Sequence, residues 1–296
     1  MLNSIEGLQE ALTDCQYVTA RDLATVIYLS LRMHKPLFLE GEAGVGKTEV
    51  SKVLARAMDS RLIRLQCYEG LDIHNAVYQW DYARQILHLK LLEASHAART
   101  DMEKSLYARE FLLARPLLQA IDFQDDKPPV LLIDEFDRAD EEFESFLLEL
   151  LSDFQITIPE IGTIRASTPP IVVITSNRTR EVHDALKRRC LYHWIDYPSF
   201  ETELSILKLK NPEISARLSR QVVYAVQQLR TIDLFKPPGV AETLDWGWAL
   251  MAMNQTELSE EVISATLGVL LKYQDDVQTV RGVFAGKLAK ETSELR

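Results

Sequence analysis

The chain has 296 residues, of which 47% are hydrophobic, and its 44 Asp plus Glu outnumber its 33 Lys plus Arg to give a formal net charge of −11. This content is ample for a core in one large or two modest domains, and the acidic balance disfavours nucleic acid as the main partner. No run approaches the roughly 18 apolar residues of a membrane span, and the first fifteen residues lack the features of a secretory signal. We therefore expect a cytoplasmic protein with no membrane partner.

Five short apolar runs, separated by helical patterns, predict the strands of a sheet. They cover residues 36–40, 62–66, 130–134, 171–175 and 191–195. Continuous runs of Leu, Ile and Val between helices are typical of strands buried on both faces of a parallel sheet. The fold class predicted is therefore α/β with a parallel five-stranded sheet.

Apolar residues recur at the helical period between these strands. The stripe after the first strand comprises Val50, Val53, Leu54, Ala57 and Met58. The stripe after the third strand comprises Phe143, Phe146, Leu147, Leu150, Leu151 and Phe154. We expect its neighbouring acids to lie on the other faces of that helix: Glu141, Glu142, Glu144 and Glu149.

Two segments interrupt the alternation of strand and helix. Residues 67–129 exceed the length of one crossover helix, so an insertion rich in aromatic residues is expected there. Residues 155–166 alternate on both sides of a turn, which predicts a β-hairpin before the fourth strand. The aromatic residues of the insertion and of the later helical region would suit a pore or client surface, but we expect them in the core: Tyr78, Trp80, Tyr82, Trp246 and Trp248.

After residues 196–200 the strand pattern stops and helical patterning continues to the end of the chain. The apolar positions are Val222, Val226, Leu229, Ile263, Leu267, Leu270 and Leu271. We therefore predict an α/β nucleotide-binding domain at 1–198 and a smaller helical lid domain at 199–296.

A glycine-rich loop between the first strand and the first stripe carries a phosphate-binding pattern. The sequence GEAGVGKT, Gly41 to Thr48, fits GxxxxGK[ST] in the strand-then-helix context that this pattern requires. Its backbone N–H groups and the helix N-terminus attract phosphate oxygens, while Lys47 reaches the β and γ phosphates and Thr48 offers its hydroxyl to Mg²⁺. The predicted ATP-binding residues are Gly41, Glu42, Ala43, Gly44, Val45, Gly46, Lys47, Thr48 and Glu49.

Polar residues that suit hydrolysis follow two other strands. Asp134 ends a buried strand and is expected, with Thr48, to hold Mg²⁺. Glu135 is the natural general base for an attacking water, and Asn177, after the fourth strand, is placed to bridge that water and the γ phosphate. No other metal site is indicated, because the six histidines show neither HExxH spacing nor a cluster with the three cysteines.

An arginine pair precedes the fifth strand. Arg188 and Arg189, in ALKRRC, would supply positive charge to a transition state, and such fingers act in trans on the nucleotide of a neighbouring subunit. We choose Arg189 first and Arg188 second for this role. The cysteines Cys15, Cys67 and Cys190 lie far apart and form no CxxC pair, so we expect buried, reduced thiols.

This ordered set of motifs resembles AAA+ ATPases over almost the whole chain. Residues 132–153, LIDEFDRADEEFESFLLELLSD, look like the DEINRA segment and following helix of the MoxR family. Residues 65–87 and 175–199 look like the branch associated with carbon monoxide dehydrogenase accessory proteins (CoxD-like). The resemblance implies a homo-hexameric ring with ATP between subunits. It also implies a chaperone that helps mature a client metalloenzyme with a partner bearing a von Willebrand factor A domain.

The chain departs from the MoxR pattern at two places. Asp137 stands where the family's DEINRA has Asn. The lid of MoxR proteins usually carries an SPR-type arginine that contacts the γ phosphate, whereas residues 239–246, GVAETLDW, contain no arginine. We therefore assign no lid residue to that contact.

Two alternatives share the same ATPase core. A clamp-loader or replication-type ATPase would act on DNA; the arginine pair favours it, and the charge of −11 and the lack of a basic stripe oppose it. A nucleotide-binding switch would turn ATP over negligibly; the presence of Asp134, Glu135, Asn177 and Arg189 together argues against it.

Overall fold

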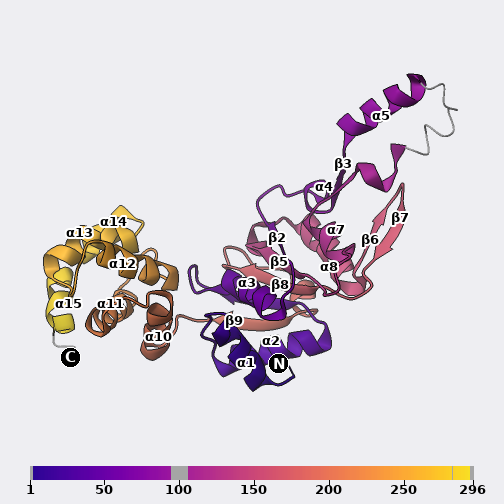
Figure 1. The fold of residues 1–296 in the computed structure, drawn as a ribbon. Helices are drawn as coiled ribbons and strands as arrows, with labels where there is room; N and C mark the ends of the chain where they lie inside the picture. The colour runs from indigo at the N-terminus through magenta and orange to yellow at the C-terminus, as the bar shows by residue number, and fades with distance from the viewer. Residues whose placement is uncertain (1–2, 95–105, 282, 294–296) are drawn as a thin grey trace. The chain divides into compact units, whose positions relative to one another are not determined.

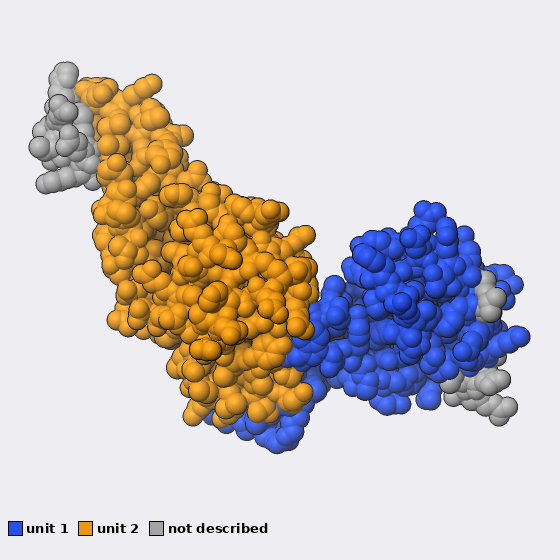
Figure 2. All heavy atoms as spheres, turned by 180° about the vertical axis from the view of Figure 1, so that it is seen from behind, with its two compact units in different colours: residues 1–21, 41–50, 194–296 blue, residues 22–40, 51–193 orange. Residues whose placement is uncertain are grey.

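The computed structural model describes residues 3–94, 106–281 and 283–293 (Figure 1). The chain divides into two compact units (Figure 2), which we call the sheet unit, residues 22–40 and 51–193, and the loop–lid unit, residues 1–21, 41–50 and 194–296. The phosphate loop thus groups with the C-terminal helices. The domain boundary at residues 198 and 199, drawn from the change in secondary structure, stays a prediction.

All five predicted strands are present within one residue of their expected bounds. They are β1 (Leu37–Gly41), β2 (Leu62–Gln66), β5 (Val130–Asp134), β8 (Ile171–Ser176) and β9 (Leu191–Ile195). They form one sheet in the order β2-β5-β8-β1-β9, and β1, β5 and β2 make parallel pairings. The parallel α/β sheet predicted from the sequence is confirmed.

The expectation that every strand is buried on both faces is wrong for two of them. Each residue of β1 and β5 is buried, whereas β2 alternates and β9 is only half-buried. The reason is topological, since β2 and β9 occupy the two edges of the sheet, where fewer elements cover them. Runs of apolar residues do not by themselves distinguish central strands from edge strands.

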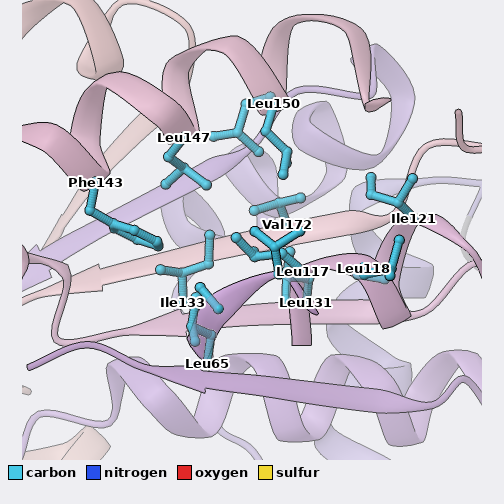
Figure 3. Packing of buried hydrophobic residues seen from close by; sticks show 14 of the residues in the cluster. Leu65, Leu117, Leu118, Ile121, Leu131, Ile133, Phe143, Leu147, Leu150 and Val172 are labelled. Carbon is cyan, nitrogen blue, oxygen red and sulfur yellow. The ribbon is translucent and has the colours of Figure 1, made fainter. Parts of the chain in front are cut away.

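Helices α7 (Pro116–Ile121) and α8 (Glu141–Asp153) pack on one face of the sheet (Figure 3). Figure 3 shows Phe143, Leu147 and Leu150 of α8 pointing at the strand residues Ile133 and Val172. One acid of α8 does not follow the predicted pattern. Glu144, expected on another face of the helix, is buried because it pairs with groups after β8.

The hairpin and the insertion are both present. The hairpin is formed by β6 (Gln155–Ile158) and β7 (Gly162–Arg165), paired antiparallel as predicted. In the insertion, β3 (Tyr78–Trp80) pairs antiparallel with β4 (Leu112–Ala114). Its other described elements are α4 (Ile73–Ala76), α5 (Tyr82–Ala94), η1 (Arg109–Phe111) and α7. The central part of the insertion, residues 95–105, lies outside the described residues.

The aromatic residues are divided between core and surface. Trp80 and Trp246 are buried and Tyr78 packs against the core, as expected. The prediction is wrong for Tyr82, which is 63% exposed on α5, and for Trp248, which is 55% exposed on α12. Tyr82 shares α5 with other exposed apolar residues, Ile86, Leu87 and Leu91. The helical period does not fix burial where no second element covers the helix.

Three further elements belong to the sheet unit. They are α2 (Arg21–Met33), which begins at its boundary, η2 (Phe136–Arg138) and α9 (Asp184–Lys187). Of the three cysteines, which the structure leaves unpaired with one another, Cys67 and Cys190 are buried as predicted, while Cys15 in the other unit is half-buried.

The loop–lid unit has its own hydrophobic core. Its helices are α1 (Ile5–Asp14), the start of α3 (Lys47–Met58), α10 (Phe200–Lys210), α11 (Ala216–Leu229), α12 (Val240–Ala252), α13 (Glu260–Leu270), α14 (Gln274–Val280) and α15 (Val283–Ser293). All seven apolar positions predicted for the C-terminal helices are buried in it, around Trp246. No helix in the described residues combines the length and apolar character that a bilayer span requires.

Candidate functional site

The phosphate loop closes around the side chain of Lys47. β1 ends at Gly41 and α3 begins at Lys47, so residues 42–46 form the turn. Gly44 and Gly46 have φ of 79° and 100°, a region that glycine adopts without steric cost. The Lys47 Nζ donates to the carbonyl oxygens of Gly41 and Glu42 at 2.8 and 2.6 Å. The ammonium therefore lies inside the curl, and Thr48 follows it in the first turn of α3.

The start of α12 is hydrogen-bonded to this loop within the same unit. The carbonyl of Gly44 accepts from the N–H groups of Val240 and Ala241 at 3.0 and 3.2 Å. The approach needs glycine on both sides: a Cβ on Gly239 would lie 2.7 Å from the Ala43 oxygen and 2.8 Å from the Gly44 Cα. Backbone groups make this contact, so no side-chain motif in the sequence marks it.

A buried ion pair fixes the segment that leads into α12. The guanidinium of Arg230 donates to both carboxylate oxygens of Glu203 at 2.7 Å each, and its Nε donates to the Pro238 carbonyl at 2.8 Å. Thr243, in the first turn of α12, donates its hydroxyl to the same carboxylate at 2.7 Å. Arg230 thus makes these contacts within the loop–lid unit. Its role was not predicted because its partners lie far away in sequence.

Asp134, at the end of β5, is held by two side chains that the sequence did not indicate. Its carboxylate is 3% exposed. The Thr175 hydroxyl donates to one oxygen at 2.6 Å, and the Arg64 guanidinium donates to the other at 2.5 Å. Parallel pairing of β5 with its neighbours β2 and β8 brings these residues together. Arg64 stands opposite a carboxylate proposed as a magnesium ligand, so a cation bound there would compete with this ion pair.

Glu135 follows directly in an uncommon backbone conformation. Its φ of 53° and ψ of 48° lie in the left-handed region, which a non-glycine residue rarely adopts. Its N–H donates to the Thr175 hydroxyl oxygen at 3.1 Å, and its half-buried carboxylate pairs with Arg138 at 3.1 Å. Glu135 is therefore partly accessible to solvent just after the strand, while Asp134 at the end of the strand is buried.

Asp137 fixes the loop that carries Asn177. Its carboxylate accepts from the N–H of Asn177 at 3.1 Å and from the N–H and hydroxyl of Thr179 at 2.8 and 2.6 Å. Asp137 is only 2% exposed, and an aspartate accepts all three bonds without needing a donor of its own. This gives a structural role to the position where the chain departs from the MoxR pattern.

A second buried acid anchors the same loop further on. Glu144 of α8 pairs with Arg180 and accepts from the N–H of His183 at 3.0 Å. The Arg180 guanidinium also donates to the carbonyl of Ala139. The loop that carries Asn177 is therefore fixed at its start by Asp137 and further on by Glu144, two carboxylates that follow β5 in the chain.

The arginine pair is exposed at the end of α9. Arg188 and Arg189 have surface-accessible side chains, and neither has a side-chain hydrogen bond or ion pair within the described residues. The preceding Lys187 is different, because its ammonium pairs at 3.0 Å with the buried carboxylate of Glu40 on β1. The structure thus separates one structural cation from two that face outward.

Cys67 directly follows β2 and is buried close to the carboxylates at and just after the end of β5. Burial, followed by the charges of Asp134, Asp137 and Glu135, raises the pKa of its thiol to about 12. Burial likewise raises the pKa of Cys190 to about 12. Both thiols stay protonated at neutral pH and are unsuited to nucleophilic chemistry.

The two predicted magnesium ligands belong to different units, Thr48 to the loop–lid unit and Asp134 to the sheet unit. Each offers a hard oxygen atom, and Mg²⁺ usually takes few protein ligands together with substrate phosphates. Among the described residues there is no group of three or more His, Cys, Asp or Glu that could hold a metal by itself. A magnesium ion bound by either residue would therefore depend on phosphate oxygens.

Comparison with known families agrees with this arrangement. Residues 36–190, from the start of β1 through the arginine pair, match the AAA domain of the dynein-related subfamily. The chain belongs to this family. The match covers the phosphate loop, the two acids, Asn177 and the arginines in one continuous stretch, so this AAA+ protein has an ATPase-type nucleotide-binding core.

Two solved structures are similar to this AAA+ protein over most of its length. One is a protein of Cytophaga hutchinsonii ATCC 33406, described provisionally as an ATPase: 14% identity, a TM-score of 0.48, and coverage of 99% of this chain and 94% of the other. The second is a mutant of RuvB from Thermotoga maritima: 15% identity, a TM-score of 0.49, and coverage of 96% and 82%. The comparison with curated proteins finds no match.

Proposed function

We propose that this AAA+ protein hydrolyses ATP, with Mg²⁺, where two copies of the chain meet in a ring. The observation that carries this proposal is the exposure of Arg188 and Arg189, neither of which has a side-chain hydrogen bond or ion pair in the part of its chain that the structure describes. The family match ends at this segment, so the arginines belong to the ATPase core. An arginine that faces outward from such a core is suited to the nucleotide of a neighbouring subunit.

Each residue has a defined task in the proposed reaction. The N–H groups of the loop and Lys47 bind the phosphates, and Mg²⁺, held by Thr48 and Asp134, would neutralise charge on the phosphate oxygens. Glu135 accepts the proton of the attacking water, which Asn177 orients toward the γ phosphate. Arg189 of the adjacent subunit, with Arg188 as second choice, stabilises the charge that develops on the transferred group.

We further propose that hydrolysis drives the remodelling of a protein complex. The similarity of residues 132–153 to MoxR proteins supports a six-membered ring acting as a chaperone. The resemblance to the CoxD-like branch supports metalloenzyme maturation with a von Willebrand factor A domain partner. A pull-down from the native host that recovers such a partner would support this part, and recovery of DNA-processing proteins with DNA-stimulated, salt-sensitive turnover would contradict it.

Mixing two inactive variants tests the shared site. Glu135→Gln should lower kcat by roughly 10²- to 10⁴-fold and Arg189→Ala by about 10³-fold, with nucleotide affinity largely retained. An equal mixture should regain turnover. At about one interface in four, an Arg189→Ala subunit supplies an intact cradle, meaning the phosphate loop with Asp134 and Glu135, and a Glu135→Gln subunit supplies an intact Arg189. No recovery, or a rate per subunit that does not change on dilution to monomer, would overturn the proposal.

A further inference from the structure

Glu40 is a buried carboxylate at the last position of β1 before the phosphate loop. It is 2% exposed and accepts hydrogen bonds from the Lys187 ammonium and the Tyr192 hydroxyl, both at 3.0 Å. The Ser176 hydroxyl lies at 3.5 Å from it. We call these four side chains, Glu40, Lys187, Tyr192 and Ser176, the Glu40 cluster. All four belong to the sheet unit.

Three members of the cluster stand one residue before a functional segment. Glu40 precedes Gly41, where the phosphate loop starts; Ser176 precedes Asn177; and Lys187 precedes Arg188. The cluster therefore ties together the strand before the loop, the strand before Asn177 and the helix before the arginines. A tie at this point fixes the position of α9 relative to the sheet.

The contacts of Lys187 orient its side chain as well as holding it. Its ammonium lies 5.5 Å from the centre of the Phe38 ring and 5.9 Å from that of Tyr192, within cation–π range. The Ser176 hydroxyl oxygen in turn accepts from the N–H of Arg178 at 3.0 Å. α9 is a single turn with Leu186 as its buried apolar residue, so this cluster is a major restraint on where the following arginines point.

We propose that the Glu40 cluster positions the arginine pair that each subunit presents to its neighbour. Glu40 and Lys187 are positioning residues: they act through α9 on Arg189 and contribute little to nucleotide binding in their own subunit. The inference rests on the proposed function, in which the arginine acts in trans. It predicts that substitutions in the cluster impair catalysis at the neighbouring subunit's nucleotide, which Arg189 serves. Nucleotide binding at the subunit's own phosphate loop should be unaffected, as should hydrolysis there when the neighbour donates an intact arginine.

The test uses the same mixing experiment with a charge-free cluster. Glu40→Gln combined with Lys187→Met removes both charges together, which avoids leaving one buried and unpaired. We expect kcat to fall at least tenfold while the Kd for a fluorescent ATP analogue stays within about twofold. Mixing the double variant with Glu135→Gln should restore turnover, as expected for the mixture of Arg189→Ala with Glu135→Gln. Mixing the double variant with Arg189→Ala should not restore it, because both then lack a correctly placed arginine.

The outcomes separate this inference from the proposed function. If Arg189→Ala recovers with Glu135→Gln but the double variant does not, the cluster serves its own cradle and the inference is wrong. Unchanged turnover of the double variant overturns it as well. If the Arg189→Ala mixture itself stays inactive, the shared site fails first.

Two further variants test whether a lower rate comes from the Glu40 cluster itself or from misfolding or the loss of any lysine ion pair. Tyr192→Phe removes one hydroxyl and keeps the ion pair; it should lower kcat about two- to fivefold and also recover with Glu135→Gln, so it decides the question if the double variant does not fold. Lys127→Met removes an exposed ion pair to Asp59, 2.9 Å long, in the same unit. It should leave turnover unchanged, and a loss there would show that any lost lysine pair lowers the rate.

Discussion

Two buried carboxylates, one in each unit, hold neighbouring segments together in different ways. Glu203 in the loop–lid unit receives a two-pronged guanidinium from Arg230, which is 7% exposed. Glu40 in the sheet unit receives a single ammonium from Lys187, which is 28% exposed. Glu203 also accepts a hydrogen bond from the Thr243 hydroxyl, and Glu40 accepts from the hydroxyls of Tyr192 and Ser176.

The difference shows that a buried glutamate can have two roles. Glu203 mainly stabilises its unit, whereas Glu40 mainly sets the direction of a neighbouring segment. A fully buried, bidentate Arg–Glu pair leaves a large uncompensated charge if one partner is lost. Lys187 reaches solvent in part, so its loss costs less folding free energy, while the adjacent arginines still depend on its direction. We therefore expect changes around Glu203 to reduce stability most and changes around Glu40 to reduce turnover most.

The largest expected effect is on the stability of the helical part of the loop–lid unit. Arg230→Met leaves the Glu203 carboxylate buried without its cation, which should lower the free energy of unfolding by about 3–5 kcal/mol. Chemical denaturation followed by Trp246 fluorescence would measure this loss, because Trp246 lies in the core of that unit. Adding Glu203→Gln to Arg230→Met should restore part of the stability; a loss below 1 kcal/mol for the single variant would remove the contrast between the two clusters.

A smaller effect is expected where α12 meets the phosphate loop. Gly239→Ala places a Cβ within 3 Å of two backbone atoms of the loop, so the start of α12 must shift at a cost of about 1–3 kcal/mol. Hydrogen exchange should then be faster at the Val240 and Ala241 amides, which donate to Gly44. Gly268→Ala is the matched control, since a Cβ there meets nothing within 4 Å. It should stabilise α13 by about 0.5–1 kcal/mol, and equal results for both variants would contradict the close approach.

The smallest effect is a difference in alkaline sensitivity between the units. Cys67 and Cys190, both in the sheet unit, have pKa values raised from the usual 9.0 to about 12. Above pH 9 their unfolded forms lose protons that the folded forms retain, so stability falls as the pH rises, by about 1 kcal/mol for each thiol between pH 9 and 10. Between pH 9 and 10 the sheet unit should weaken first, as seen by hydrogen exchange.

Thiol labelling gives an independent measurement of the same burial. At pH 8 the half-buried Cys15 should react with a maleimide well before Cys67 and Cys190. Replacing both buried cysteines by alanine should flatten the pH dependence of stability between pH 9 and 10. Rapid labelling of Cys67 in the folded protein would contradict its burial behind the acids.

Local patterns predicted the elements well because their causes are local. Runs of Leu, Ile and Val placed all five strands, and the turn between residues 155 and 166 placed the hairpin. The glycine loop was found for the same reason, since positive φ at Gly44 and Gly46 requires glycine at those positions. Burial was predicted less well: Glu144 and Tyr82 took the opposite environments from those expected, because a distant partner covers the first and no described element covers the second.

The sequence by itself determined the strands, the phosphate loop and the order of the acids, Asn177 and the arginines, because backbone propensity and side-chain period act over a few residues. Only the tertiary structure decided which charged groups pair: Glu40 with Lys187, Glu203 with Arg230, Asp134 with Arg64. These partners are separated by 27 to 147 residues and meet through parallel strand pairing and helix packing. A buried charge is stable only with such a partner, and no local pattern records where that partner lies.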